Sequence, residues 1–222
     1  MLAIRTPKVK ICCIQSIAEA RMAARAGADW IGLVSQMPSG PGVISEEQIA
    51  QIATAVRKEV LTVLLTSKRD ADEIIDQHQR TRTDALQLVD QVTPEELRRL
   101  RSKIALATVF QVIHVRGEEA LQRAKAVSPL VDGLLLDSGN PSVEPKQLGG
   151  TGRLHDWSIS RRIREECDKP VFLAGGLHPA NVRSAVLDVG PYAVDVCSGV
   201  RTSGALDSAK LHAFMLAVHG KR

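Results

Sequence analysis

The sequence predicts an α/β protein built as a single (β/α)8 barrel over residues 1–222. Eight short aliphatic runs alternate with eight segments of helical character along the chain. The 222 residues divide into eight repeats of about 28 residues, close to the roughly 30 residues of one strand–helix–strand unit. An open doubly wound sheet rarely needs eight units of such regular length, so a closed barrel explains the pattern better.

The predicted strands are nearly continuous apolar runs rather than alternating ones. Strands that are buried on both faces, as in a parallel barrel covered by helices, have this pattern. We expect them at residues 9–14, 30–34, 60–65, 85–89, 104–113, 131–136, 171–174 and 192–197.

The predicted helices begin at residues that can cap their first turn. Ser16 and Ser45 are followed three residues later by Glu19 and Gln48, and Thr93 precedes a proline at the first helical position. Such residues suit the unpaired backbone amides of a helix start. We expect helices at residues 16–27, 45–58, 70–80, 93–102, 117–127, 156–167, 179–188 and 207–218.

Charge and aromatic content argue against a nucleic-acid partner. The chain has 29 Lys and Arg against 25 Asp and Glu, a net charge of +4, with two Trp, one Tyr and three Phe. Its basic residues are dispersed over the predicted helices, whereas nucleic-acid binding usually needs a concentrated basic face. The mildly basic balance suits an anionic small substrate.

Membrane insertion, secretion and metal binding are not expected either. No apolar run approaches the roughly 18 residues that span a bilayer, and the first residues lack the long apolar segment of a signal peptide, so we expect a cytoplasmic protein. Cys12, Cys13, Cys167 and Cys197 have the spacing of neither a disulfide framework nor a metal site. We therefore expect reduced thiols, no metal and no cofactor.

Glycines follow the seventh and eighth predicted strands. Gly175 and Gly176 come directly after the seventh, and Ser198 and Gly199 directly after the eighth. Barrels commonly bind phosphate at these two strand ends, where glycine lets backbone amides approach an anion. Either pair alone is better explained as a tight turn, but together they predict a phosphate site.

The longest irregular segment, residues 138–155, follows the sixth predicted strand and contains the glycine cluster 149–152. A loop of this length is more often functional than not. Gly150 and Gly152 are candidate phosphate-binding residues, and a merely flexible loop is the alternative. The cluster matches neither the nucleotide P-loop nor the dinucleotide-binding fingerprint, so ATP and NAD are not predicted.

Two strand ends carry candidate acid–base groups. Asp137 ends an all-leucine run and places a carboxylate at the rim of a buried strand, where capping of a loop is the alternative role. Cys12 shares a strand face with Lys10, two residues earlier. A buried cysteine is usually inert packing, but a neighbouring cation can lower a thiol pKa enough to make the thiolate a base.

Several motifs in order along the chain resemble the phosphoribosylanthranilate isomerase family. They are Lys10-Ile11-Cys12-Cys13-Ile14, Ala26-Gly27-Ala28-Asp29-Trp30-Ile31-Gly32, Leu134-Leu135-Leu136-Asp137, Gly149-Gly150-Thr151-Gly152 with Asp156-Trp157, Leu173-Ala174-Gly175-Gly176-Leu177, and Val194-Asp195-Val196-Cys197-Ser198-Gly199-Val200. Together they extend over nearly the whole chain.

The resemblance implies a cofactor-independent Amadori rearrangement of N-(5-phosphoribosyl)anthranilate in tryptophan biosynthesis. It implies that Cys12 is the general base and Asp137 the general acid. Lys10 and Gln87, the latter in the fourth-strand motif, are further substrate-binding candidates. The expected partners are a phosphorylated sugar substrate and, as one option, a second copy of the chain as a homodimer.

All but one of the chain's departures from the family pattern fall in the second to fourth units, and the exception is Cys13. The arginine of the family's Ser-Pro-Arg element, which holds the anthranilate carboxylate, is replaced within Pro38-Ser39-Gly40-Pro41-Gly42. Leu65-Thr66-Ser67 and Val89-Asp90 also differ from the family, and Cys13 stands where the family has glycine.

Three interpretations remain open at this point. The chain is an anthranilate enzyme whose carboxylate anchor is Arg153 or His155, a related isomerase of another phosphorylated aminosugar, or a non-catalytic phosphosugar-binding barrel. Retention of both Cys12 and Asp137 disfavours the last, because binding alone requires neither residue.

Overall fold

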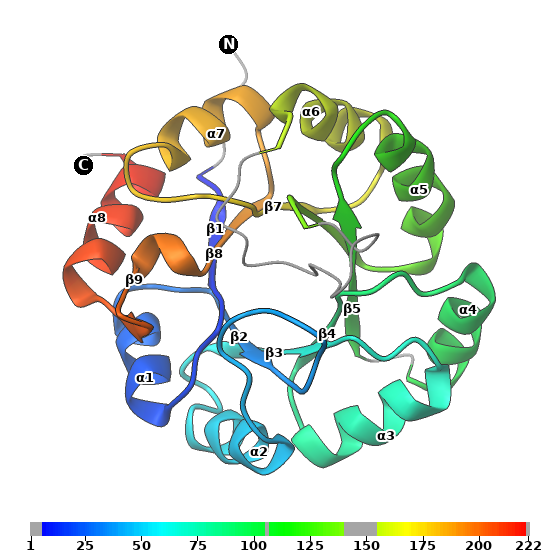
Figure 1. Cartoon of the computed structure of the whole chain (residues 1–222), viewed down its shortest axis with the longest axis horizontal. Helices are drawn as coiled ribbons and strands as arrows, with labels where there is room; N and C mark the ends of the chain where they lie inside the picture. Colours follow the sequence, from blue (N-terminus) through cyan, green and yellow to red (C-terminus); the bar gives the residue numbers. More distant parts are fainter. Residues whose placement is uncertain (1–5, 105–106, 140–154, 221–222) are drawn as a thin grey trace.

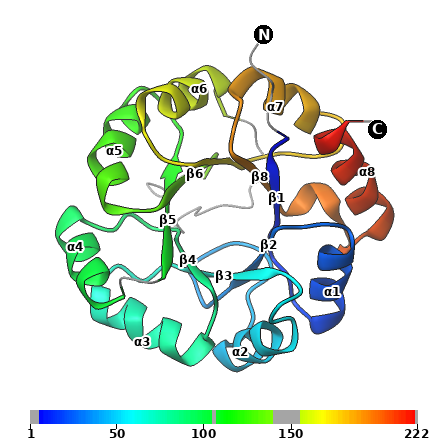
Figure 2. The ribbon, with the colours of Figure 1, turned by 180° about the vertical axis from the view of Figure 1, so that it is seen from behind.

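The computed structural model describes residues 6–104, 107–139 and 155–220. Eight parallel strands close into a barrel in chain order, and β1 pairs with both β2 and β8. Helices form a ring around the barrel (Figures 1 and 2). The predicted (β/α)8 TIM barrel is confirmed.

The barrel strands are β1 (Lys8–Ile11), β2 (Trp30–Val34), β3 (Leu61–Thr66), β4 (Ala85–Leu88), β5 (Thr108–His114), β6 (Gly133–Asp137), β7 (Val171–Leu173) and β8 (Ala193–Val196). The α-helices are α1 (Ile17–Arg25), α2 (Glu46–Ala55), α3 (Ala71–Thr81), α4 (Pro94–Lys103), α5 (Glu119–Val127), α6 (Trp157–Glu166), α7 (Val182–Val189) and α8 (Ser208–His219). Two 3₁₀ helices, η1 (Ser128–Leu130) and η2 (Ser198–Val200), and a short hairpin of β9 (Arg201–Thr202) and β10 (Ala205–Leu206) complete the fold.

The predicted helix caps are present. The Ser16 hydroxyl accepts a hydrogen bond from the Glu19 amide, and Ser45 forms a capping box with Gln48. The Thr93 hydroxyl likewise caps α4. Local sequence therefore fixes where these helices begin.

Several predicted boundaries are wrong by a few residues. The first strand ends at Ile11 rather than at residue 14, because the backbone of Cys13 turns into the left-handed region with φ 62°. Ile104, predicted to start the fifth strand, is instead the C-cap of α4. Its backbone amide donates a hydrogen bond to the Leu100 carbonyl. The sixth strand starts at Gly133 rather than at residue 131, and the β9–β10 hairpin was not predicted.

Side chains of the strands divide between two apolar cores, since successive residues of a strand point to opposite faces. One core lies between barrel and helices, and the other fills the barrel interior. Trp30, Phe110, Phe172 and Tyr192 pack near the amino ends of the strands, with the Phe110 and Phe172 ring centroids 4.7 Å apart and those of Trp30 and Phe172 5.1 Å apart. These aromatic rings close the end of the barrel at which the strands begin.

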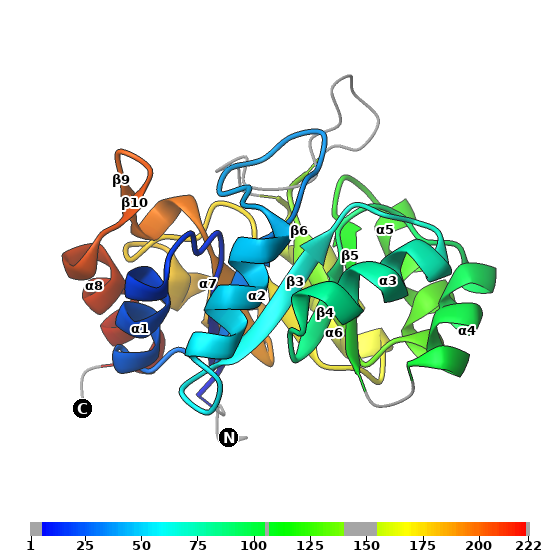
Figure 3. The same cartoon turned by 90° about the horizontal axis from the view of Figure 1, so that it is seen from below.

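The loops that follow the strands rise on one side of the molecule, and the chain termini lie on the other (Figure 3). Among the described helices, none has both the length and the apolar character that crossing a bilayer requires. The side where the strands end is the face that carries active sites in this fold.

Candidate active site

A cavity opens at the carboxyl ends of the strands. It is lined by residues of β2, β3, β4, β6 and β8 and of the segments after β1, β2, β4, β7 and β8. Active sites of (β/α)8 barrels lie at this face. The cavity is therefore the candidate active site.

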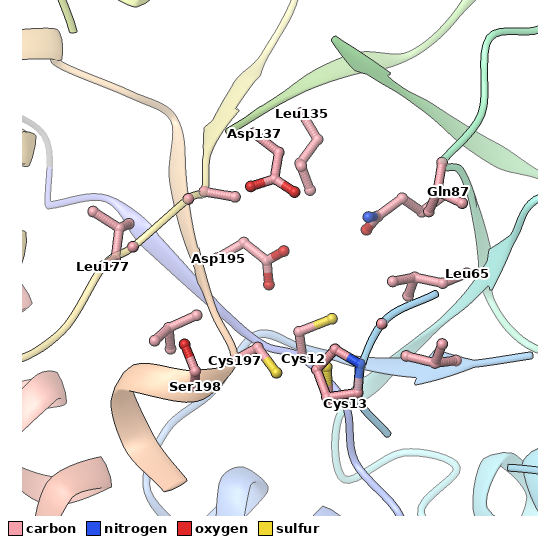
Figure 4. A pocket seen from close by; sticks show the side chains of 18 of the residues that line it. Cys12, Cys13, Leu65, Gln87, Leu135, Asp137, Leu177, Asp195, Cys197 and Ser198 are labelled. Carbon is pink, nitrogen blue, oxygen red and sulfur yellow. The ribbon is translucent and has the colours of Figure 1, made fainter. Parts of the chain in front are cut away.

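Cys12 and Asp137 lie on different walls of this cavity, as predicted from their strand positions. Cys12 follows β1 and Asp137 is the last residue of β6. Figure 4 shows both side chains directed into the cavity, with Asp195 of β8 between them. A substrate in the cavity can thus contact both groups at once.

The carboxyl group of Asp137 is buried and titrates near neutral pH. Burial raises its pKa from 3.8 to about 6, with a further contribution from the nearby charge of Asp195. The hydrogen bond from the Ser138 amide to Oδ1, at 2.8 Å, and the charge of Lys10 oppose this rise. The side chain can therefore carry a proton and release it at a pH where most carboxyl groups are ionised.

The buried Asp137 carboxyl also makes the free energy of unfolding depend on pH. Because its pKa is about 6 in the folded protein and near 3.8 otherwise, the folded state keeps a proton that the unfolded chain has lost between these values. Its favourable contribution is complete below the lower pKa and is lost as the pH rises through the upper one, at a cost of about 3 kcal/mol.

We expect Asp137→Asn to unfold at a higher denaturant concentration than the parent protein near pH 8, with little difference near pH 4. Asparagine keeps the shape of the side chain and has no charge to bury. Urea unfolding at the two pH values measures the difference. A variant that is no more stable than the parent near pH 8 would contradict the assignment of a buried, reluctantly ionised carboxyl.

Lys10 and Asp195 form a buried ion pair at the floor of the cavity. Lys10 is 0% exposed, and its Nζ donates to Asp195 Oδ1 at 3.0 Å. Burial opposes the charge of Lys10, but Asp195 and then Cys12 outweigh it and raise the pKa of Lys10 above its usual range. Lys10 was predicted to bind substrate, yet it does not line the cavity and lies beneath Cys12 and Asp195.

Gly32 of β2 gives the Lys10 ammonium and the Cys12 thiol the space that they need. A Cβ at this position would lie 2.9 Å from Cys12 Sγ and 3.0 Å from Lys10 Nζ. The absence of a side chain on β2 therefore lets the ammonium and the thiol share one corner of the barrel.

The thiol of Cys12 is held in an environment that favours its ionised form. A hydrogen bond with the Cys13 side chain lowers its pKa most, burial opposes this effect, and the charge of Lys10 lowers the pKa further. The same hydrogen bond, together with one to Cys197, raises the pKa of Cys13. Cys12 is thus the more acidic thiol of the adjacent pair and can serve as a base.

Asp195 is a functional candidate that sequence analysis did not select. It lines the cavity although it is only 6% exposed, and burial raises the pKa of its carboxyl group. A carboxylate within the otherwise apolar strand β8 was the available signal. Asp195 was not assigned a role because its partner Lys10 is 185 residues away in the sequence, and such a contact cannot be predicted from neighbouring residues.

The predicted phosphate loops lie side by side at one edge of the cavity. Gly175, Gly176 and Ser198 line it, and Gly175 and Gly176 have φ values of 81° and 64° that favour glycine. Gly199 packs so closely on the preceding loop that a Cβ would lie 2.0 Å from the Leu177 carbonyl oxygen. The two loops therefore form one wall, whereas predicted Gly150 and Gly152 lie outside the described residues.

Gln87 and His155 differ in their relation to the cavity. Gln87 lines it, and its buried Oε1 has no hydrogen-bond partner among the described residues. His155 is absent from the cavity wall, and its Nε2 lies 2.7 Å from Ser160 Oγ. Burial lowers the pKa of His155 to about 4, so the ring is neutral at neutral pH. Arg153, the other predicted anchor, lies outside the described residues.

Comparison with known proteins identifies the family. The model of the family described as N-(5'-phosphoribosyl)anthranilate (PRA) isomerase matches residues 9–217, which include every barrel strand except the first residue of β1. The chain belongs to the N-(5'-phosphoribosyl)anthranilate isomerase family.

Curated isomerases of this family match over nearly their full length. The isomerase of Methanosarcina acetivorans is 32% identical, and the alignment covers 94% of this chain and 91% of the relative. The isomerase of Haloferax volcanii is 35% identical, with 97% and 94% covered.

Solved isomerases have the same fold. The enzyme of Thermotoga maritima superposes with a TM-score of 0.82 at 30% identity, with 96% of this chain and 98% of the other covered. Another, with a TM-score of 0.79, 28% identity and the same coverage, was solved in complex with reduced 1-(o-carboxyphenylamino)-1-deoxyribulose 5-phosphate.

The chain is thus a phosphoribosylanthranilate isomerase of tryptophan biosynthesis, an intramolecular oxidoreductase. The prediction made from the motifs is confirmed. The alternatives, a related isomerase of another phosphorylated aminosugar and a non-catalytic phosphosugar-binding barrel, receive no support from the curated relatives.

The loop after β2 forms part of the cavity wall of this isomerase. Ser39, Gly40 and Pro41 line the cavity, and Gly42, with φ 78°, packs directly on Cys13. A Cβ at Gly42 would lie 2.6 Å from the Cys13 Cβ. No lysine or arginine is found among the described residues that line the cavity, so the described wall supplies no cation for a carboxylate.

Proposed function

We propose that Asp137 and Cys12 carry the two proton transfers of the isomerisation. Asp137 protonates the ring oxygen of N-(5-phosphoribosyl)anthranilate and the sugar opens to a Schiff base. Cys12 then removes the C2 proton, which gives an enolamine that tautomerises to the ketone. The observation that carries this proposal is the placement of two oppositely perturbed groups on separate walls of one cavity.

The protonation states support these roles. A general acid must hold a proton near working pH, and the raised pKa of Asp137, about 6, brings its carboxyl group toward that range. A thiol base must lose its proton, and Cys12 is aided by Cys13 and by the ammonium of Lys10. Each transfer contributes roughly 10² to 10⁴ in rate.

We assign the phosphate of the substrate to the wall formed by Gly175, Gly176, Ser198 and Gly199. Its support is the close contact between the two loops at the edge of the cavity, where Gly175, Gly176 and Ser198 form part of the wall. Gly150 and Gly152 of the loop after β6 complete this site in our proposal. Gln87 binds the substrate through its amide, whose buried oxygen has no other partner among the described residues.

A cation must neutralise the anthranilate carboxylate, and we assign it to Arg153. The cavity wall described in the structure has no lysine or arginine, and the alternative, His155, is uncharged because burial lowers its pKa to about 4. Lys10 is already paired with Asp195. Arg153 follows the glycine cluster 149–152 in the loop after β6.

We expect Arg153→Ala to raise the KM for phosphoribosylanthranilate by roughly one to three orders of magnitude. This range corresponds to loss of a charge-assisted contact worth about 1.5 to 3 kcal/mol or more. Steady-state kinetics on the purified protein measures it. Arg98→Ala, on the exposed outer face of α4, is the matched control and should leave KM unchanged. Equal KM values for Arg153→Ala and the control would refute the assignment.

The remaining features of the proposal concern the whole chain. We propose a single-domain cytoplasmic enzyme that needs neither metal nor organic cofactor, and the free state of its described cysteines suits a reducing compartment. A homodimer is proposed by analogy with the dimeric isomerase of Thermotoga maritima, of which generated monomers were solved. Assay of the purified chain on phosphoribosylanthranilate after chelation tests the independence from metal, and light scattering tests the homodimer.

A further inference from the structure

Three thiols gather at one corner of the cavity, and we call Cys12, Cys13 and Cys197 the thiol cluster. Cys12 and Cys13 follow β1, whereas Cys197 follows β8. These strands are neighbours, because Ile11 is in register with Val196 and the Cys12 amide donates to the Val196 carbonyl at 2.8 Å. Figure 4 shows the three sulfur atoms grouped on this side of the cavity.

Cys13 is the central member of the thiol cluster. Its thiol lies against the side chains of both Cys12 and Cys197 (Figure 4). Cys12 and Cys13 are 6% and 4% exposed, whereas Cys197 is half-buried, and all three are free thiols that line the cavity. A small oxidant entering the cavity can therefore reach Cys197, with Cys13 already in contact with it.

Contacts to the backbone carbonyl and the Cβ of Cys13 hold this residue in place. Its φ of 62° is a left-handed conformation that glycine would adopt more easily. Arg201 donates to the Cys13 carbonyl and is held by a partly buried ion pair with Glu19, whose Oε2 lies 3.0 Å from Arg201 Nη2. Gly42 packs on the Cys13 Cβ. The Cys13 sulfur is thus kept beside Cys197 by a rigid surrounding.

We propose that Cys13 and Cys197 are a modification site for hydrogen peroxide, at which they form a reversible disulfide. Peroxide oxidises the Cys197 thiol to a sulfenic acid and is itself reduced to water. The Cys13 thiol then attacks this sulfur, the S–S bond forms, and the hydroxyl group leaves as a second water. Two thiols and one peroxide become one disulfide and two waters, and a dithiol reductant reverses the reaction.

The disulfide switches the isomerase off in this proposal. Cys13 without its S–H group can no longer donate to Cys12, and the base loses the hydrogen bond that most favours its ionised form. This consequence rests on the proposed role of Cys12 as general base, whereas the disulfide itself does not. A direct Cys12–Cys13 bond is disfavoured, because adjacent cysteines close a strained ring.

Peptide mapping tests the disulfide without any activity measurement. Trypsin releases Cys12 and Cys13 together in residues 11–21, Cys197 in residues 184–201 and Cys167 in residues 165–183. After peroxide and alkylation, we expect residues 11–21 linked to 184–201 with loss of two hydrogens, and no link to 165–183. Dithiothreitol should separate the linked pair.

Variants assign the bond to its two sulfurs. We expect the link in Cys12→Ser and in the control Cys167→Ser, and its absence in Cys13→Gly and Cys197→Ser. Glycine suits the backbone of Cys13, so Cys13→Gly should fold normally. Absence of the link in the parent protein, or its persistence in Cys13→Gly, would overturn the proposal.

Activity measurements test the switch, with each protein compared with its own untreated sample. We expect kcat of the parent and of Cys167→Ser to fall about tenfold or more at neutral pH after peroxide, because a rise of one unit in the pKa of Cys12 lowers its thiolate fraction about tenfold. Dithiothreitol should restore kcat. Cys13→Gly should show no dithiothreitol-reversible loss. A linked peptide with unchanged activity would overturn the switch, whereas full turnover by Cys12→Ser would refute the proposed base and leave the disulfide standing.

Discussion

Cys12→Ser is expected to lower kcat by about 10² to 10⁴ while the substrate still binds. Serine nearly preserves the shape of the side chain, but its hydroxyl remains protonated where a thiol beside Lys10 and Cys13 can ionise. The ammonium of Lys10, paired with Asp195 at 3.0 Å, stabilises an anion at residue 12 and cannot itself accept a proton. The loss should therefore appear in the chemical step.

Steady-state kinetics with phosphoribosylanthranilate, together with binding of the product in a calorimeter, separates turnover from affinity. Cys167→Ser is the matched control, because Cys167 caps the end of α6 away from the cavity. The control should keep its kcat. A Cys12→Ser protein with near-normal kcat would show that another group removes the C2 proton.

Asp137→Asn is expected to abolish ring opening, again with a loss of about 10² to 10⁴ in kcat. An amide of the same shape fills the end of β6 but has no acidic proton for the ring oxygen. The nearby Asp195 is a poor substitute, because its Oδ1 already accepts from Lys10 and the pair holds the base in place. The variant should bind ligand, since only the proton is lost.

Asp168→Asn is the control for this substitution. Asp168 is exposed in the turn before β7, at the opposite end of the barrel from the cavity. Its kcat should match the parent, whereas that of Asp137→Asn should fall at every pH. Because Asp137→Asn is expected to be more stable than the parent near pH 8, a folding defect cannot account for its lost turnover. A substantial residual kcat would assign the acid elsewhere.

The barrel could be predicted because the sequence of each strand–helix unit contains local signals of its strand and helix. Runs such as residues 30–34 are apolar on both faces, and the caps at Ser16, Ser45 and Thr93 mark helix starts within single turns of chain. The ends of strands and helices were harder to predict where the backbone conformation of a single residue determines the end. The left-handed backbone conformation of Cys13 ends β1 early. A cysteine side chain gives no indication of that conformation.

The candidate site was predictable only in part for the same reason. Cys12, Asp137 and the glycine turns sit at strand ends, so fold and position suffice to bring them to one face. The roles of Lys10 and Asp195 depend on a contact across 185 residues, and the unpredicted bond between Arg201 and the Cys13 carbonyl spans 188. Contacts of this separation arise from barrel closure and leave no trace in a local pattern.

The pairing of β1 with β8 also sets the order in which this enzyme can acquire its chemistry. The strand that carries Cys12 is made first and the strand that carries Asp195 nearly last. Until the last strand leaves the ribosome and docks, Lys10 has no carboxylate beside it and Cys13 no contact with Cys197. Contacts of such long separation form slowly. The buried ion pair and the thiol cluster therefore exist only in a finished barrel.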